Sequence, residues 1–293
     1  MTTASAEAPP TTAAGAPAAA PPRIPPRAWD RARTAALALW SAVALLYLFL
    51  PIFLVVLFSF NDPAGRFNYT WQGFTLEHWK DPFGVEGLGE AVANSLEIAV
   101  ISTAIALVLG TGMALALVRH RFRGRGAVDM FTFLPLASPE VVLGAALLAL
   151  FLTMNVATGF VTIVIAHVMF NVAYVVVTVK ARLEGMDRHI EEAAMDLGAN
   201  EWTTFRKITL PMIAPGLAAA ALLAFVLSLD DFVITNFTAG ETQTFPLFIW
   251  GAARQGVPPQ VNVIATALLV IALALMALNL VVQRRRAAAA FAG

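Results

Sequence analysis

The sequence EAAMDLG at Glu192–Gly198, followed by ITLP at Ile208–Pro211, lies in a polar loop between two long apolar segments. The loop, residues 181–211, is more acidic than basic. A polar helical segment of this length on a very hydrophobic chain is typical of a docking site for another protein.

The loop sequence predicts two short helices with a break between them. Asp187 can cap the start of the first helix, and Gly198 lies where a left-handed residue would end it. Asn200 can cap the second helix. Pro211 can then open the next apolar segment, because the missing N–H group of proline is tolerated in a first turn. The tip of the hairpin should present a small apolar patch within an acidic rim.

The composition predicts an all-α integral membrane protein. The chain is 59% hydrophobic and 13% charged, whereas roughly 25% of the residues of soluble domains are charged. A helix needs about 20 apolar residues to cross a bilayer. Six segments meet this requirement and predict six transmembrane helices, near residues 35–59, 91–118, 130–154, 156–180, 212–233 and 261–282.

The distribution of Lys and Arg predicts the orientation. If the N-terminus is cytoplasmic, all but three of the 19 basic residues fall in cytoplasmic segments. The three exceptions are Arg66, Lys80 and Arg254. By the positive-inside rule, both termini and the loop at 181–211 are therefore expected in the cytoplasm.

The ends of the chain are expected to contribute little to the fold. Residues 1–33 are rich in Ala and Pro and predict a disordered cytoplasmic tail rather than a signal peptide. Residues 34–283 form the expected six-span membrane domain, and residues 284–293 a short cytoplasmic tail. The chain has no Cys, which excludes disulfides and thiolate metal sites. We expect no metal site, and we expect His167 to be a hydrogen-bonded packing residue, because it has no partner ligands.

Four carboxylates fall within or at the ends of the expected spans: Glu97, Glu140, Asp230 and Asp231. A charged group near the bilayer centre costs about 2.5–3.5 kcal/mol on insertion scales, so each needs an explanation. All four lie in the middle or outer half of the membrane, and no basic residue lies at a comparable depth. An outward-facing anionic cavity for a cation is the simplest interpretation.

Structural explanations remain open for some of these residues. Asp230 and Asp231 can instead cap a turn outside the membrane. Glu97 can pair with Asn94 or hold two helices together. Glu140 directly follows a proline near the middle of the third span and is the hardest to explain without a function.

Three aromatic residues are candidates for completing a cation site: Tyr174, Phe232 and Trp250. Aromatic faces attract alkylammonium groups. The alternative is that each belongs to the interfacial aromatic belt or to helix packing.

The loop motif resembles the signature loop of the membrane subunits of ABC importers. Beyond the loop, the chain is similar to the C-type permease subunits of spermidine/putrescine importers from about residue 90 to 282. The segments that carry this similarity are Asn94–Leu96, Pro139–Gly144, Ser228–Val233, Pro258–Asn262 and Ala265–Thr266. The resemblance implies a type I ABC importer permease (MetI-like) fold with a five-helix core and a peripheral first helix.

The resemblance also implies a coupling helix that contacts a separate ATPase, with Gly198 at the closest contact. The residues implied in this contact are Glu192, Ala193, Ala194, Asp196, Leu197, Gly198, Ala199 and Asn200. The sequence contains no GxxxxGK[ST] motif, so ATP is expected on partner ATPase subunits and no cofactor on this chain.

The partners implied by the resemblance are a second permease subunit, two ATPase subunits and an extracytoplasmic binding protein. The loops at residues 60–90 and 234–260 would face the binding protein. The substrate would be a cationic small molecule, a polyamine by the resemblance, imported by alternating access across the cell (inner) membrane. The permease would make and break no covalent bond.

Other interpretations differ in substrate or in class. The loop could lie on lipid headgroups, although its acidity suits an anionic surface poorly. The substrate could be an opine, an amino acid derivative or ferric ion. The chain could also be a stand-alone channel or carrier, whereas an integral-membrane enzyme would need a cluster of catalytic side chains that the sequence lacks.

Overall fold

The computed structural model describes residues 28–65 and 67–291. Most of the expected disordered tail therefore lies outside the described residues. The described elements are helices, apart from an isolated antiparallel bridge between Asn61 and Phe74. The chain divides into two compact units, Met1–Ile52 and Phe53–Gly293.

The first long helix, α1 (Ala28–Phe58), continues through Pro51 without interruption. Its segment Arg33–Phe58 is long and apolar enough to cross a membrane. The helix begins in the first unit and ends in the second. The expected first span therefore corresponds to α1.

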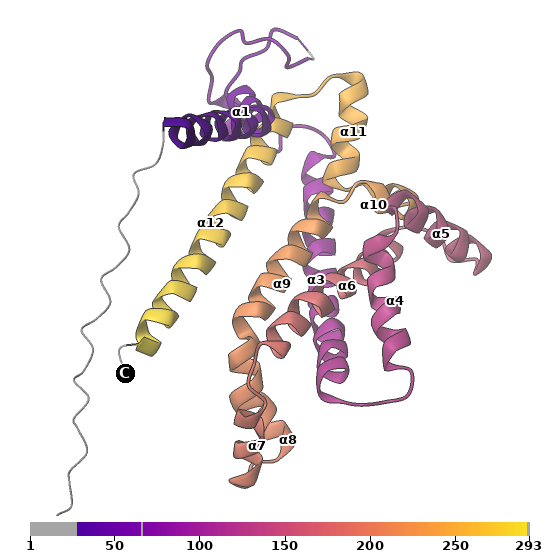
Figure 1. The fold of residues 1–293 in the computed structure, drawn as a ribbon. Coiled ribbons are helices and arrows are strands. Elements are labelled where there is room, and N and C mark those ends of the chain that lie inside the picture. Colours follow the sequence, from indigo (N-terminus) through magenta and orange to yellow (C-terminus); the bar gives the residue numbers. More distant parts are fainter. Residues whose placement is uncertain (1–27, 66, 292–293) are drawn as a thin grey trace, which may run out of the picture. The chain divides into compact units, whose positions relative to one another are not determined.

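Three long helices form the centre of the second unit: α3 (Leu88–Arg119), α6 (Phe160–Glu184) and α9 (Leu210–Asp230) (Figure 1). Small side chains let their backbones approach closely. A Cβ atom at Gly110 of α3 would lie 2.7 Å from Val175 Cγ1 of α6. The buried alanines at the same junction are Ala106, Ala114, Ala220 and Ala224.

The segment expected as the third span, residues 130–154, consists of two helices. α4 (Arg125–Ala137) and α5 (Glu140–Thr153) meet at an angle of 108°. Pro139 lacks an N–H donor and forces the residue before it out of the helical region. Ser138 is accordingly extended, and its Oγ donates to Leu134 O at 2.7 Å. Among the described residues five helices can each cross a membrane, or six spans result if the bent pair counts as one.

The second unit also contains α2 (Glu77–Lys80), α10 (Val233–Thr238), α11 (Phe245–Gln255) and α12 (Pro259–Phe291). α10 packs on α5, where a Cβ atom at Gly144 would lie 2.5 Å from Phe237 Cδ2. α11 packs on α3. α12 continues to Phe291, so most of the expected C-terminal tail is helical.

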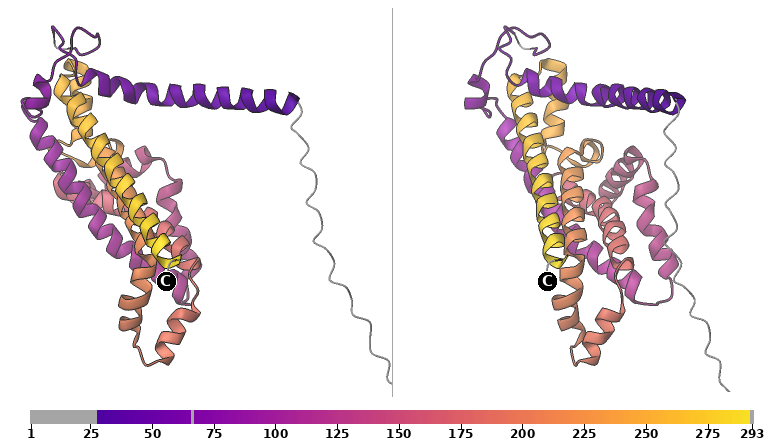
Figure 2. Two further views of the ribbon diagram at one scale, coloured as in Figure 1. Left: turned by 90° about the vertical axis from the view of Figure 1, so that its left-hand side faces the viewer. Right: turned by 60° about the vertical axis from the view of Figure 1, so that its left-hand side comes forward.

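The polar loop forms a hairpin at the end of the bundle opposite α11 (Figure 2). It contains α7 (His189–Asp196) and α8 (Glu201–Thr204), and a wider π-type turn (Phe205–Thr209) joins α8 to α9 without a break. The sequence analysis placed the start of the fifth span at Pro211, whereas the helical run begins at Glu201. The wider turn ends two residues before Pro211, whose ring would clash with the carbonyl four residues earlier, within that turn, in a regular α-helix.

Candidate functional site

A cavity of about 280 Å³ lies where α9 ends and α10 begins. Helices α4, α5 and α6 supply the rest of its wall. Five of the seven residues expected on a substrate path line it: Glu140, Tyr174, Asp230, Asp231 and Phe232. The remaining lining residues are apolar: Pro135, Leu143, Phe170, Leu227, Val233 and Ile234.

Two of the cavity carboxylates are exposed and unpaired. Glu140 is the first residue of α5, and Asp230 is the last residue of α9. Neither side chain forms an ion pair with any described residue. The bend at Pro139 brings Glu140 to the cavity, because it turns the start of α5 toward the end of α9. The cavity therefore carries negative charge that no described cation neutralises.

The third carboxylate, Asp231, is held in place. Its Oδ2 accepts hydrogen bonds from Thr235 N and Thr235 Oγ1, both at 2.7 Å. Its Oδ1 accepts a longer bond from Ile234 N at 3.4 Å. Asp231 thus satisfies N–H groups in the first turn of α10, as the capping alternative described, and it also lines the cavity.

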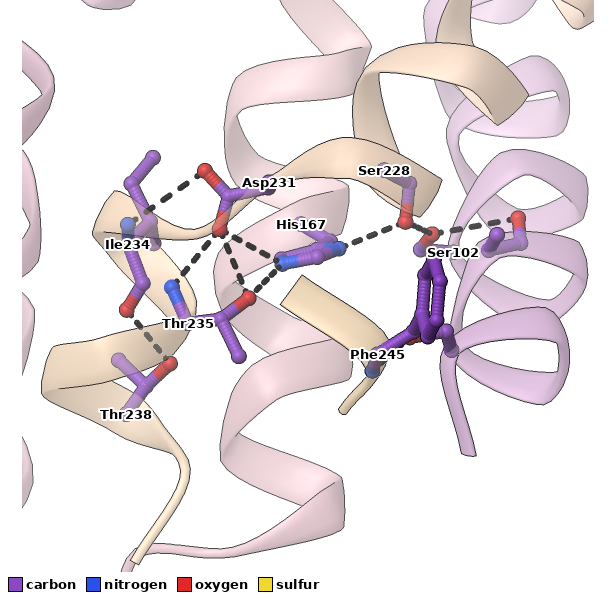
Figure 3. Close-up of polar contacts among 10 residues, drawn as sticks. Ser102, His167, Ser228, Asp231, Ile234, Thr235, Thr238 and Phe245 are labelled. Carbon is purple, nitrogen blue, oxygen red and sulfur yellow. Dashed lines mark hydrogen bonds and ion pairs between the residues drawn. The ribbon is translucent and has the colours of Figure 1, made fainter. Parts of the chain in front are cut away.

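His167 forms the hydrogen bonds expected of it, and they lead to the cavity wall (Figure 3). Its Nδ1 lies 2.6 Å from Ser228 Oγ, and its Nε2 lies 2.9 Å from Thr235 Oγ1 and 3.3 Å from Asp231 Oδ2. Ser228 Oγ in turn lies 3.0 Å from Ser102 Oγ of α3. This chain of side chains crosses the bundle from α3 to α10.

The sequence analysis did not assign a role to the serines and the threonine of this chain. Ser228 precedes Asp231 by three residues in α9, and Thr235 follows it by four in α10, since α9 ends at Asp230 and Asp231 itself is extended. Their closeness to Asp231 in the sequence is a usable signal for Ser228 and Thr235, although the break between the two helices removes any regular helical spacing. Ser102 is far away in the sequence and carries no such signal.

The two other candidates lie outside the cavity. Glu97 is exposed on α3, and Asn94 does not pair with it but donates to Gln243 O at 2.9 Å. The ring of Trp250 in α11 lies 5.1 Å from the ring of Phe232 and 5.0 Å from the Arg254 guanidinium. Trp250 therefore reaches the cavity wall only through Phe232.

The expected caps at Gly198 and Asn200 are present, whereas the residue at the N-cap of α7 is Arg188 and not the expected Asp187. Gly198 has φ +89° and ends α7, with Gly198 N donating to Met195 O at 2.9 Å and Ala199 N to Ala194 O at 3.1 Å. This pair of bonds is the Schellman motif that glycine favours. Asn200 Oδ1 accepts from Thr203 N at 2.8 Å and caps α8.

Asp187 and His189 form an exposed pair at the start of α7. Asp187 Oδ1 accepts from His189 N at 3.0 Å and lies 2.7 Å from His189 Nδ1. The side-chain hydrogen bond to Asp187 raises the pKa of His189. The bond from the His189 backbone N–H lowers the pKa of Asp187.

The tip of the hairpin exposes large apolar side chains. Leu197 is 90% exposed and Trp202 is 67% exposed. Acidic side chains, including Glu192 and Asp196, lie exposed around them. The expected apolar patch within an acidic rim is therefore present on the hairpin.

Glu191, another acidic residue of the loop, lies apart from that rim. Its Oε2 forms an ion pair with Arg119 Nε of α3 at 2.9 Å, and its Oε1 accepts from Thr209 Oγ1 at 2.7 Å. The residue is 9% exposed. Glu191 thus ties α7 to the end of α3 and to the turn that leads into α9.

Comparison with known proteins identifies the family to which this helical membrane bundle belongs. Residues 106–288 match the family model "Binding-protein-dependent transport system inner membrane component". The spermidine/putrescine transport system permease protein PotC of Haemophilus influenzae is 39% identical over 240 residues, which covers 82% of this chain and 93% of that protein. The putrescine transport system permease protein PotI of Escherichia coli K12 is 40% identical over 242 residues, which covers 78% and 85%.

Solved structures share the fold. A bacterial ABC transporter involved in the import of the acidic polysaccharide alginate superposes with a TM-score of 0.65 at 17% identity, covering 89% of this chain and 99% of that chain. The MetNI methionine ABC transporter superposes with a TM-score of 0.56 at 15% identity, covering 68% and 95%. The fold is that of type I ABC importer permeases. With its family match and its close relatives, this chain belongs to the family of binding-protein-dependent transport system inner membrane components.

Proposed function

We propose that this chain is a transmembrane permease subunit of an ATP-driven importer for polyamines of the spermidine and putrescine type. The observation that carries this proposal is the cavity in which Glu140 and Asp230 lie unpaired beside Asp231. The names of the similar permeases, PotC and PotI, support the same class of substrate.

The lining of the cavity suits a flexible chain with several ammonium groups. Carboxylates at its wall attract the ammonium groups, and aromatic faces of Tyr174 and Phe232 add cation–π attraction. Leu143 and Leu227 offer apolar contact to the methylene groups between the charges. A metal cation of small radius would use the carboxylates but not this apolar and aromatic wall.

We further propose that the hairpin is the coupling element. Leu197 and Trp202 at its tip would dock into a groove of a cytoplasmic ATPase subunit, because a side chain as exposed as Leu197 is otherwise unfavourable in water. The contact residues proposed are Glu192, Ala193, Ala194, Asp196, Leu197, Gly198, Ala199 and Asn200. Both termini would then lie in the cytoplasm with the hairpin.

The proposed mechanism is alternating access. Closure of two ATPase subunits on ATP would displace the hairpin as a rigid body, and α3 and α9 would follow it. The cavity would open in turn to the extracytoplasmic binding protein and to the cytoplasm, in a heterodimer with a second permease. ATP would be bound and hydrolysed on the ATPase subunits. This chain would make and break no covalent bond.

The test is reconstitution of this chain in liposomes with its partner permease, ATPase and binding protein. We expect uptake of labelled spermidine or putrescine that requires ATP and every subunit. A screen of the binding protein against polyamines, basic amino acids and ferric ion identifies the cargo independently. Uptake by the purified chain alone, without nucleotide, would contradict the proposal, and a binding protein selective for another solute would contradict the polyamine assignment.

A further inference from the structure

We propose that His167 is a positioning residue of the cargo cavity, which holds Asp231 as a fixed carboxylate in the cavity wall. The inference rests on the proposed function of the cavity as the cargo site. Its basis is the hydrogen-bonded chain from Ser102 to Asp231, which passes through His167 (Figure 3).

The chain is buried from Ser102 to Thr235, up to the point where Asp231 meets the cavity. His167 is 1% exposed and Ser228 3%, while Ser102 and Thr235 are fully buried. Buried polar groups are strongly destabilising when unpaired, so a network of this kind persists only when its members satisfy one another. Each of the two His167 nitrogens has a partner within 2.9 Å. The network therefore leaves little freedom in the orientation of the imidazole.

The positions of the protons follow from the chemistry of the groups. A carboxylate only accepts, so the single hydroxyl proton of Thr235 is donated to Asp231. Thr235 Oγ1 can then only accept from His167, which means that Nε2 of His167 carries a hydrogen. In a neutral imidazole Nδ1 accepts in turn from Ser228 Oγ. From Ser228 through His167 and Thr235, the donors of the chain thus point toward Asp231.

This arrangement gives the two oxygens of Asp231 different roles. Oδ2 receives Thr235 N and Thr235 Oγ1 at 2.7 Å and lies 3.3 Å from His167 Nε2. Within the described part of the chain, Oδ1 has only the 3.4 Å contact from Ile234 N. Oδ1 is therefore the oxygen with lone pairs left for a cargo ammonium group.

The three cavity carboxylates then divide into two kinds. Asp231 is fixed by α10 and by His167, whereas Glu140 and Asp230 are exposed and unpaired and can follow the cargo. A fixed anion contributes more to binding per contact, because little side-chain entropy is lost when the cargo arrives. His167 supplies that rigidity without touching the cargo cavity, since it is absent from the cavity lining.

The functional test uses the complete reconstituted importer and measures cargo imported per ATP hydrolysed. His167→Leu removes both hydrogen bonds, and we expect this ratio to fall about tenfold, the size of one hydrogen bond to a charged group. ATP hydrolysis stimulated by the loaded binding protein should stay within about twofold, which distinguishes lost positioning from a lost fold. His167→Gln supplies an amide N–H that can donate to Thr235 and Asp231. This variant should therefore import much more cargo per ATP than His167→Leu does.

Two further variants show whether His167 acts through Asp231. Asn171 lies one turn further along α6, is fully buried, and has no side-chain hydrogen-bond partner among the described residues. Asn171→Ala should therefore keep the wild-type ratio. Asp231→Asn should lower the ratio, and adding His167→Leu to it should lower it no further. Additive effects of the two substitutions, or a wild-type ratio in His167→Leu, would overturn the inference.

A second measurement needs no cargo. The chain has four histidines, so ¹⁵N-histidine NMR of the assembled importer, with His167→Gln for assignment, reports the state of each His167 nitrogen. We expect a hydrogen on Nε2, and an unprotonated Nε2 would overturn the inference. If the wild-type importer does not take up polyamines, only the proposed substrate is overturned. The NMR result, and the amount of the delivered solute imported per ATP in each variant, still decide the role of His167.

Discussion

Arg119 at the end of α3 and Glu191 in α7 form an ion pair, with 2.9 Å between Arg119 Nε and Glu191 Oε2. Thr209 Oγ1 donates to the other oxygen of Glu191, which connects the same carboxylate to the turn before α9. Further along the bundle, Ser102 and Ser228 join α3 to α9 at 3.0 Å. The hairpin is therefore attached to both helices that lead toward the cavity.

Replacing Glu191 by Gln should weaken the transmission of hairpin movement. The amide can still accept from Thr209, but the largely buried Arg119 loses its counter-charge, and breaking such a pair costs on the order of 3 kcal/mol. We expect ATP hydrolysis to continue while cargo uptake per ATP falls about tenfold. Parallel assays of ATP hydrolysis and uptake in the reconstituted importer measure this ratio.

Glu192→Gln, one residue further along the chain, is the comparison variant, and it changes an exposed carboxylate of the proposed ATPase contact surface. Its side chain is 48% exposed and pairs only with Arg188 at 3.2 Å, so its ion pair contributes little. Loss of this charge should leave uptake per ATP close to the wild-type value. Copurification of the ATPase shows separately whether the substitution disturbs docking. Equal ratios in the two variants would show that Glu191 is not a transmission point.

Several of these features could be predicted from the sequence because they are local. The caps at Gly198 and Asn200 depend on residues within one turn, and the motif spacing alone placed them. Three of the four carboxylates expected at one cavity, Glu140, Asp230 and Asp231, line it, because charges in apolar segments avoid lipid, whereas Glu97 lies outside it.

Other features depend on long-range packing and could not be read from the pattern. Glu191 and Glu192 look alike in a polar run, yet a step of one residue turns the helix by about 100° and separates a buried carboxylate from an exposed one. The contact of Ser102 with Ser228 joins residues 126 positions apart. The bend at Pro139 was not predicted, because an apolar window averages over the proline that interrupts the segment.

Gly198→Asn should separate backbone strain from docking. Gly198 has φ +89°, a region that Asn tolerates better than other residues with a side chain, and a Cβ atom there would meet nothing within 4 Å. The free hairpin should therefore keep its fold. If the glycine faces the ATPase closely, the new side chain should prevent docking, and copurification of the ATPase should fall at least about tenfold.

Gly185→Ala is the control for this variant in the same loop. Gly185 has φ −80°, and a Cβ atom there would make an ordinary contact of 3.6 Å with Ala181 O. Copurification should remain at the wild-type level. Undiminished copurification in Gly198→Asn would remove Gly198 from the proposed contact surface.

The pair at the start of α7 predicts a pH dependence of the hairpin. Asp187 raises the pKa of His189 above its ordinary value of 6.5. The contribution of protonated His189 to the stability of the folded hairpin is therefore fully present below pH 6.5 while Asp187 is ionised. This contribution is lost as the pH rises through the raised pKa of the folded state. NMR titration of His189 in the assembled importer should give a pKa above 6.5 that returns toward this value in Asp187→Asn. An unchanged titration in that variant would assign the shift to another group.

Glu140→Gln and Asp230→Asn should each reduce import of a cationic cargo more than they reduce assembly. Both carboxylates line the cavity and have no ion-pair partner among the described residues, so neither substitution leaves a cation unpaired within that part of the chain. We expect uptake per ATP to fall about tenfold in each variant, because one charged contact to the cargo is lost. Glu97→Gln is the matched control, since Glu97 is an exposed carboxylate outside the cavity lining. Equal losses in all three variants would point to a general effect of charge on the membrane domain, whereas a loss confined to Glu140 and Asp230 locates the cargo at this cavity.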